Sequence, residues 1–360
     1  MSINNYNFKI NKTKIGKDYP CYFIADIAAN HDSDLIKAKE LIFAAAENGA
    51  NAAKFQHFQA ETIVSDYGFK SLSKKSSHQS TWKKSVFEVY KSASINLDWT
   101  LELKETCRKA KIDFFTSPYS LELVDLVNKH VPAHKIGSGD ITWHEIVEYI
   151  AKKQKPYILA TGASNFSEVK TIIKKCLKIN KKLAILQCNT NYTANDENFK
   201  FISLNVLKTY AKHFPNCIIG LSDHTLGYAT VLGAITLGAK IIEKHFTLDN
   251  KKKGPDHFFS MNPKTWFEMI KASRQLEYAL GSDKKIIEKN EIDTVVLQRR
   301  AIRVKNDLLK GKILKKEDLV FLRPCPKGAL EPYNFKKLLN KKLNKNILKD
   351  DIVKLIDVSN

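Results

Sequence analysis

The sequence has no long hydrophobic run. Its most apolar stretches, Ile218–Leu221 and Val231–Leu237, are far shorter than the roughly 20 residues that cross a bilayer as a helix. The segment Met1–Lys17 is polar, with lysine, asparagine and isolated isoleucines, and it lacks the apolar core of a secretory signal. We therefore expect a cytoplasmic protein with no membrane partner.

Cysteine is scarce and scattered. The six cysteines include no Cys-x-x-Cys pair, which argues against a disulfide framework and against a cysteine-based zinc site. The glycine fingerprint that an open dinucleotide-binding sheet usually carries after its first strand is also absent.

A basic stripe interleaved with aromatic residues is missing as well, although the formal net charge is +21. The lysines are spread along the whole chain, mostly on the outer faces of predicted helices. We therefore predict no nucleic-acid partner. The positive field should favour an anionic substrate.

Short apolar runs alternate with amphipathic segments through most of the chain. A helical spacing of apolar residues from Leu35 to Ala45, ended by Gly49, is typical of these segments. Buried strands alternating with helices predict a parallel sheet covered by helices, and eight such units are typical of a (β/α)₈ TIM barrel. A doubly wound open sheet is the alternative. The eight predicted strands are Tyr22–Ala28, Ala52–Phe58, Asp113–Ser117, Ala133–Gly137, Tyr157–Thr161, Leu183–Cys188, Ile218–Ser222 and Ile241–Phe246.

One long insertion and one change in the sequence pattern divide the chain. Residues 60–97, which include Trp82, Phe87 and Tyr90, are long for a connection between a strand and a helix, so we expect them to fold over the barrel mouth. After Gly281 short β-like pieces and turns replace the long repeat. We predict a catalytic barrel over 1–280, a linker over 281–298 and a small β-rich domain over 299–360.

Polar residues follow every predicted strand. The active site of a TIM barrel lies at the carboxyl ends of its strands, so these side chains should face one ligand. Lysines and hydroxyls suit a phosphate and a carboxylate, and small residues let the backbone approach an anion. The residues are Asp26, Lys54, Gln56, Ser117, Lys135, Ser138, Thr161, Gln187, Thr190, Tyr192, Ser222, His224, Glu243 and His245, with Asp256 in a loop after the last strand.

Within this set, His224 and His245 give the most specific prediction. They terminate adjacent strands, which lie about 4.8 Å apart, so both imidazoles can reach one ion. Two histidines without cysteine predict an open site for a divalent ion, Mn²⁺ first, with Mg²⁺ or Co²⁺ as substitutes.

Several segments resemble the sialic acid (N-acetylneuraminate or nonulosonate) synthase family in order and spacing. The tail, with Arg299-Arg300 and Leu322-Arg323-Pro324, is similar to that family's C-terminal SAF domain, a β-clip fold that resembles type III antifreeze protein. The resemblance covers roughly residues 20–355. In the barrel it rests on Phe23–Asp26, Asn30-His31, Lys54–Gln56, Lys135–Gly139, Gly220–Thr225, Ile242–Thr247 and Gly254–His257.

The resemblance implies a transferase that condenses phosphoenolpyruvate with an N-acylated mannosamine-type sugar. A metal held by His224 and His245 would polarise the sugar aldehyde, and phosphate would leave with C–O cleavage. Asp26 and Lys54 would join the histidines in catalysis. The resemblance further implies carboxylate binding by Lys54 and Ser117, phosphate binding by Lys135 and Ser138 with Thr161 and Ser222 nearby, and sugar contacts from Gln56, Thr190, Tyr192 and Asp256. Arg323 would enter the partner's site in a domain-swapped homodimer.

The chain departs from the family pattern at four positions. Asp26 stands where the family usually has Glu, Ala160 where it has Ser, Thr190 where Asn or Ser is commoner, and Thr193 where Pro is usual. We interpret these departures as a different sugar or a distinct subfamily, such as a legionaminate-type synthase. The other hypotheses are an aldolase-like barrel lyase and a non-catalytic sugar-binding or antifreeze-like module.

Overall fold

The computed structural model describes residues 6–72, 79 and 82–360. The chain divides into two compact units, Met1–Gly281 and Ser282–Asn360. Within the described ranges, no helix is both long and apolar enough to cross a membrane.

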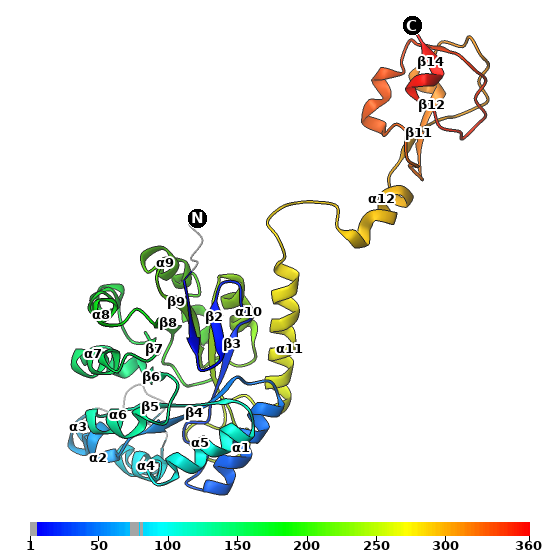
Figure 1. Cartoon of the computed structure of the whole chain (residues 1–360). Coiled ribbons are helices and arrows are strands. Elements are labelled where there is room, and N and C mark those ends of the chain that lie inside the picture. The colour runs from blue at the N-terminus through cyan, green and yellow to red at the C-terminus, as the bar shows by residue number, and fades with distance from the viewer. Residues whose placement is uncertain (1–5, 73–78, 80–81) are drawn as a thin grey trace. The chain divides into compact units, whose positions relative to one another are not determined.

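The first unit is an eight-stranded parallel barrel, as predicted (Figure 1). Neighbours along the chain are neighbours in the sheet, and β10 pairs with β3. This pairing of the first and last barrel strands makes a nearly closed barrel and rules out the doubly wound alternative. Strands β5 and β6 pack side by side without ladder hydrogen bonds. The strands are β3 (Tyr22–Asp26), β4 (Ala52–His57), β5 (Asp113–Pro118), β6 (His134–Ile136), β7 (Tyr157–Ala160), β8 (Leu183–Cys188), β9 (Ile218–Asp223) and β10 (Ile241–His245).

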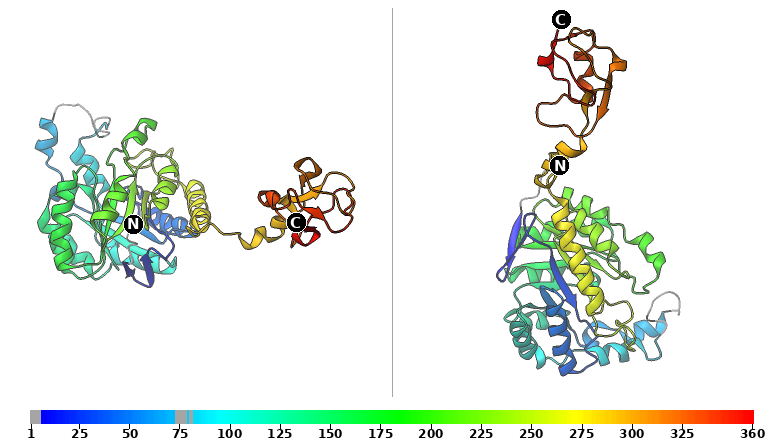
Figure 2. Two further views of the ribbon diagram at one scale, coloured as in Figure 1. Left: turned by 90° about the horizontal axis from the view of Figure 1, so that it is seen from above. Right: turned by 90° about the vertical axis from the view of Figure 1, so that its right-hand side faces the viewer.

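Helices surround the strands on the outside of the barrel (Figure 2). Their apolar faces pack on the outward-facing residues of the strands in one large core. Asp34 caps the first helix, and Asn262 with Thr265 forms a capping box on the last. The helices are α1 (Leu35–Glu47), α5 (Trp99–Lys109), α6 (Leu121–Asn128), α7 (His144–Lys152), α8 (Phe166–Ile179), α9 (Val206–His213), α10 (Ala229–Thr236) and α11 (Pro263–Leu280).

A β-hairpin lies ahead of the first barrel strand, where the polar sequence gave no strand prediction. Strands β1 (Asn7–Ile10) and β2 (Thr13–Gly16) pair antiparallel. Phe8, Ile10 and Ile15 are buried in a second core with inward-facing residues from the barrel strands. The hairpin therefore closes one end of the barrel interior.

The described part of the insertion after β4 includes the short helices α2 (Ala60–Ile63), α3 (Asp66–Ser71) and α4 (Val86–Ala93). Ser85 and Glu88 form a capping box at the start of α4.

The second unit has its own core around Ile302, Val304, Leu314, Leu338 and Val353. Two small antiparallel sheets frame it, β11 (Ala301–Val304) with β12 (Leu319–Leu322) and β13 (Lys342–Leu343) with β14 (Val358–Ser359). Helix α12 (Ile292–Gln298) occupies the second half of the segment for which we predict a linker.

Candidate active site

A cavity of about 490 Å³ lies at the carboxyl ends of the barrel strands. Polar strand-end residues form one side, and residues of the insertion, mostly apolar but including Gln79, contribute to the other. The lining includes Gln56, Tyr119, Ser138, Thr190, Tyr192, His245 and Asp256, together with Phe58, Ile63, Trp82, Val89, Tyr90 and Ala93. The insertion thus covers the mouth, as its length predicts.

His224 and His245 lie side by side, with ring centroids 5.3 Å apart. His224 Nδ1 is 2.8 Å from the Asn189 carbonyl oxygen, so it donates there, and this bond fixes the ring with Nε2 as the available electron-pair donor. The pKa of His245 lies well below its usual value because of burial and the neighbouring His224. A neutral imidazole is the form that binds a metal ion.

The surroundings of His245 fit a divalent ion. Its buried Nδ1 has no hydrogen-bond partner, and carboxylates of Asp26 and Asp256 lie 3.5 and 3.9 Å from its two ring nitrogens. Among the described residues, no group of three or more His, Cys, Asp or Glu side chains could hold a metal ion. If the pair holds an ion, the histidines would supply two ligands, and the other coordination positions would fall to water or substrate.

Two buried lysines reach the same region. Lys54 Nζ lies 2.7 Å from Asp26 Oδ2, and both side chains are only 3% exposed. Burial lowers the pKa of Lys54, but Asp26 and Glu243 outweigh it, so the pKa is raised and the amine stays a cation. Lys135 Nζ lies 3.4 Å from Glu243 Oε1. Both ammonium groups are thus held by carboxylates at the strand ends.

Two polar atoms among these groups lack partners. The Ser117 hydroxyl and Glu243 Oε2 are buried without a hydrogen bond. Ser222 donates to the other carboxylate oxygen, Glu243 Oε1, at 3.1 Å. Because buried polar groups are normally satisfied, these atoms indicate a place for a polar ligand.

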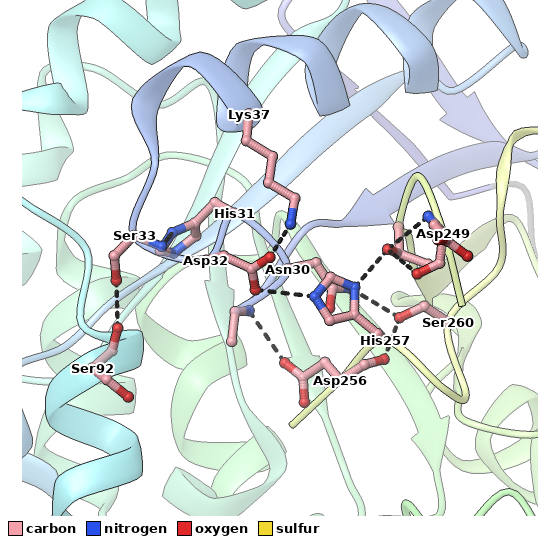
Figure 3. Close-up of polar contacts among 12 residues, drawn as sticks. Asn30, His31, Asp32, Ser33, Lys37, Ser92, Asp249, Asp256, His257 and Ser260 are labelled. Atoms are coloured by element: carbon pink, nitrogen blue, oxygen red, sulfur yellow. Dashed lines mark hydrogen bonds and ion pairs between the residues drawn. The ribbon is translucent and has the colours of Figure 1, made fainter. Parts of the chain in front are cut away.

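The apolar side of the cavity rests on aromatic contacts between strand ends and the insertion. Phe58 packs on Tyr90 at 5.5 Å and on Tyr119 at 6.0 Å between ring centroids. Helix α4, which carries Tyr90, is tied to the loop after β3 because the Ser33 hydroxyl donates to the Ser92 carbonyl (Figure 3).

A family model described as the NeuB family matches residues 41–285, about two thirds of the chain. The chain belongs to the NeuB family. It is 33% identical over 348 residues to the N,N'-diacetyllegionaminic acid synthase of Legionella pneumophila, which covers 95% of this chain and 96% of that protein. It is 31% identical to human N-acetylneuraminate-9-phosphate synthase, over 94% and 93% of the two chains.

A solved structure of the family has the same architecture. The N-acetylneuraminic acid (sialic acid) synthetase of Leptospira borgpetersenii, crystallised with citrate, superposes with a TM-score of 0.71 at 27% identity. The match covers 81% of this chain and 95% of that one. This NeuB family member therefore shares its barrel fold with nonulosonic acid synthases.

Most of the residues that we predict for the site lie together. Gln56, Ser138, Thr190, Tyr192, His245 and Asp256 line the cavity. Asp26 and His224 are linked to it through His245, and Lys54 is linked to it through Asp26. Lys135 and Ser222 both contact Glu243, whose charge also acts on Lys54. Ser117 is buried at the end of β5, beside Gln56 in the register.

Thr161 does not line this cavity, and the role of Arg323, which belongs to the second unit, stays a prediction. Thr161 donates to the Leu186 carbonyl at 2.9 Å and lines a neighbouring cavity of about 1210 Å³ beyond β7 and β8, which shares Thr190 and Tyr192 with the first. Arg323 is an exposed residue of the second unit, directly after β12. Ala160, at the end of β7, is buried in the barrel interior.

The sequence places Glu243 among the polar strand-end residues but predicts no catalytic or binding role for it. Its position between Ile242 and Lys244 at the end of β10 marks it as a strand-end carboxylate. Its link to Lys135, whose strand lies on another side of the barrel, depends on the closed sheet.

Proposed function

We propose that this chain is a nonulosonic acid synthase that condenses phosphoenolpyruvate with the open-chain form of an N-acylated mannosamine-type sugar. The observation that carries the proposal is that the buried Lys54, Lys135 and unpartnered Ser117 hydroxyl and the His224–His245 pair all lie at the carboxyl ends of the barrel strands, beside the cavity that His245 lines. An anionic substrate and an aldehyde would need these two sets of groups side by side.

In the proposed reaction, C3 of phosphoenolpyruvate bonds to the aldehyde carbon, and the aldehyde oxygen takes up a proton and becomes a hydroxyl. Water adds at C2 and loses a proton, and the bond between C2 and the bridging oxygen breaks, so inorganic phosphate leaves. Lys54 and Ser117 would hold the carboxylate, while Lys135, Ser138 and Ser222 would hold the phosphate. Asp26 would keep Lys54 oriented and face the reacting carbons.

His224 and His245 would hold a divalent ion, for which we propose Mn²⁺. When bound, that ion would supply Lewis-acid polarisation of the aldehyde oxygen. Gln56, Thr190, Tyr192 and Asp256 would orient the sugar, since they line the cavity beside His245.

Within this class, a 2,4-diacetamido-2,4,6-trideoxy sugar is the second candidate for the acceptor. The wall formed by Phe58, Ile63, Trp82, Val89 and Tyr90 is mostly apolar, although Gln79 also lines it, and it suits methyl groups better than a phosphate. This wall supports a legionaminate-type synthase.

An aldolase-like lyase is disfavoured by the charge on Lys54. A Schiff-base lysine needs a lowered pKa to attack a carbonyl, whereas Asp26 and Glu243 raise the pKa of Lys54. Borohydride trapping with pyruvate should therefore leave the protein unlabelled.

The test is phosphate release from phosphoenolpyruvate with Mn²⁺ across three acceptors: N-acetylmannosamine, its 6-phosphate and 2,4-diacetamido-2,4,6-trideoxymannose. We expect turnover with one acceptor and its loss in a folded His224→Ala variant. Silence with all three acceptors, from folded protein with metal bound, would contradict the proposed substrate class.

A further inference from the structure

Two loops at the barrel mouth are joined by a buried histidine. His257, in the loop after β10, is fully buried, and its Nε2 lies 3.0 Å from Asp32 Oδ1 in the loop after β3 (Figure 3). Asp32 also forms an ion pair with Lys37 of α1. The contact therefore links segments that lie 225 residues apart in the chain.

The imidazole of His257 is held in one orientation from both sides. Its Nδ1 lies 2.7 Å from the Thr247 hydroxyl. Burial lowers the pKa of His257 to about 4, so the ring is neutral. Nε2–H then donates to Asp32, and Nδ1 accepts from Thr247. Gly254 passes so close that a Cβ there would lie 2.6 Å from the ring.

Asp256, directly before His257, faces the candidate site. Its Oδ2 accepts a hydrogen bond from the Ala29 amide at 3.2 Å and lies 3.9 Å from His245 Nδ1. Its carbonyl accepts from the Ser260 hydroxyl at 2.6 Å, and Asn30 donates to that same hydroxyl at 2.9 Å. The hydrogen bonds of Asp256 thus depend on the position of Ala29 and Asn30 in the loop after β3.

Asp32 and His257 themselves do not line the cavity, whereas Ala29 and Asp256 do. We propose that Asp32 and His257 form a positioning pair that holds the Asp256 carboxylate against the Ala29 amide and toward His245. The pair acts mainly on the acceptor sugar, because Asp256 lines the cavity beside His245, whereas its interaction with Lys54 is one of charge at longer range. This inference rests on the proposed function.

The test uses the full chain and the acceptor that the wild type turns over. His257→Asn removes the donor to Asp32, whereas His257→Gln can place an amide N–H close to the position of Nε2. We expect His257→Asn to raise the KM for the sugar about 10- to 100-fold, the range that a shift near 1 Å produces. The KM for phosphoenolpyruvate should change less than about 3-fold, and His257→Gln should recover most of the loss. His130→Gln, beyond the end of α6 and at the opposite end of the barrel, is the matched control.

A double-mutant cycle separates positioning from general support of the fold. In an Asp256→Asn background, His257→Asn should add less than about 2-fold to the sugar KM, because its target is already lost. Equal losses in both backgrounds would overturn the proposal.

Hydrogen exchange gives a readout that needs no turnover. Peptides covering 27–34 and 250–261 should exchange at least about 10-fold faster in His257→Asn than in the wild type. Unchanged exchange rates in both peptides would overturn the proposal that Asp32 and His257 form a positioning pair. A wild type that turns over none of the acceptors would contradict the proposed function alone. The hydrogen-exchange comparison would still test whether Asp32 and His257 hold the two loops together.

Discussion

A buried ion pair sets the spacing of the two candidate metal-binding histidines. Asp223 directly precedes His224, Lys244 directly precedes His245, and Lys244 Nζ lies 2.5 Å from Asp223 Oδ2 with both side chains almost fully buried. Thr225 and Thr230 satisfy the remaining carboxylate positions. The pair therefore ties the ends of β9 and β10 together.

Removing one member of this pair should be costly. Lys244→Met leaves the Asp223 carboxylate buried without its counter-ion, so we expect a loss of about 3–5 kcal/mol in the free energy of unfolding. Urea denaturation measures this loss. Lys264→Met on the exposed side of α11 should change stability by less than about 0.5 kcal/mol. An unfolding midpoint equal to that of the wild type would show that the pair contributes nothing.

His57, beside Gln56 in β4, makes stability depend on pH. Its ring nitrogens lie 2.6 and 2.9 Å from the hydroxyls of Thr116 and Thr100, and burial, aided by His130, lowers its pKa to about 4. The unfolded chain takes up this proton near pH 6.5, before the folded chain does. The contribution of the neutral His57 to the free energy of unfolding is thus complete above pH 6.5. It is lost as the pH falls toward 4, by about 1.4 kcal/mol per pH unit.

A His57→Gln variant should lack this share of the acid response. Between pH 6.5 and 5 it should lose about 2 kcal/mol less stability than the wild type, by urea denaturation at each pH. Above pH 7 the two proteins should respond alike to pH. Parallel curves through the acid range would argue against a neutral buried His57.

At the scale of single residues, the sequence predicts which side chains gather at the site better than it predicts their partners. Strand ends of a barrel share one face, so Lys54, Lys135, His224 and His245 could be selected from strand positions alone. Their acidic partners could not be assigned, because the pairing of Lys135 with Glu243 depends on which strands face each other across the barrel.

At the scale of elements, strand β9 depends on a glycine. A Cβ on Gly220 would lie 2.3 Å from the Ile241 carbonyl oxygen in β10 and 2.4 Å from the Leu186 side chain in β8. Gly220→Ala should therefore push adjacent strands apart and cost about 1–3 kcal/mol or more in thermal or urea unfolding. Gly139→Ala, where the new Cβ meets no atom within 4 Å, is the control and should be near neutral. Equal stability of the two variants would contradict this packing.

The strands were the most predictable elements, because buried parallel strands are continuous apolar runs. Each of the eight observed barrel strands begins and ends within two residues of its predicted bounds. The hairpin was missed for a physical reason. Its strands are four residues long, and lysine and asparagine on the exposed face leave only two or fewer buried apolar residues in each.

At the scale of the whole molecule, each unit has its own hydrophobic core. A fragment of Ser282–Asn360 should therefore fold alone, with dispersed amide resonances and a cooperative thermal transition. A chain ending at Gly281 should keep its helical circular dichroism. If the family's swapped dimer forms, that chain should sediment as a monomer while the full chain sediments as a dimer. A collapsed, uncooperative fragment would show that the second core depends on the barrel.

The N-terminal hairpin has a consequence for the order in which the molecule is built. It is translated before every barrel strand, yet Phe8, Ile10 and Ile15 are buried among residues from β3, β5, β7, β8, β9 and β10. That site exists only once β10 has joined β3, more than 200 residues later in synthesis. A segment translated ahead of the whole barrel thus packs only after the last barrel strand is in place, and during that interval its apolar residues remain available to chaperones.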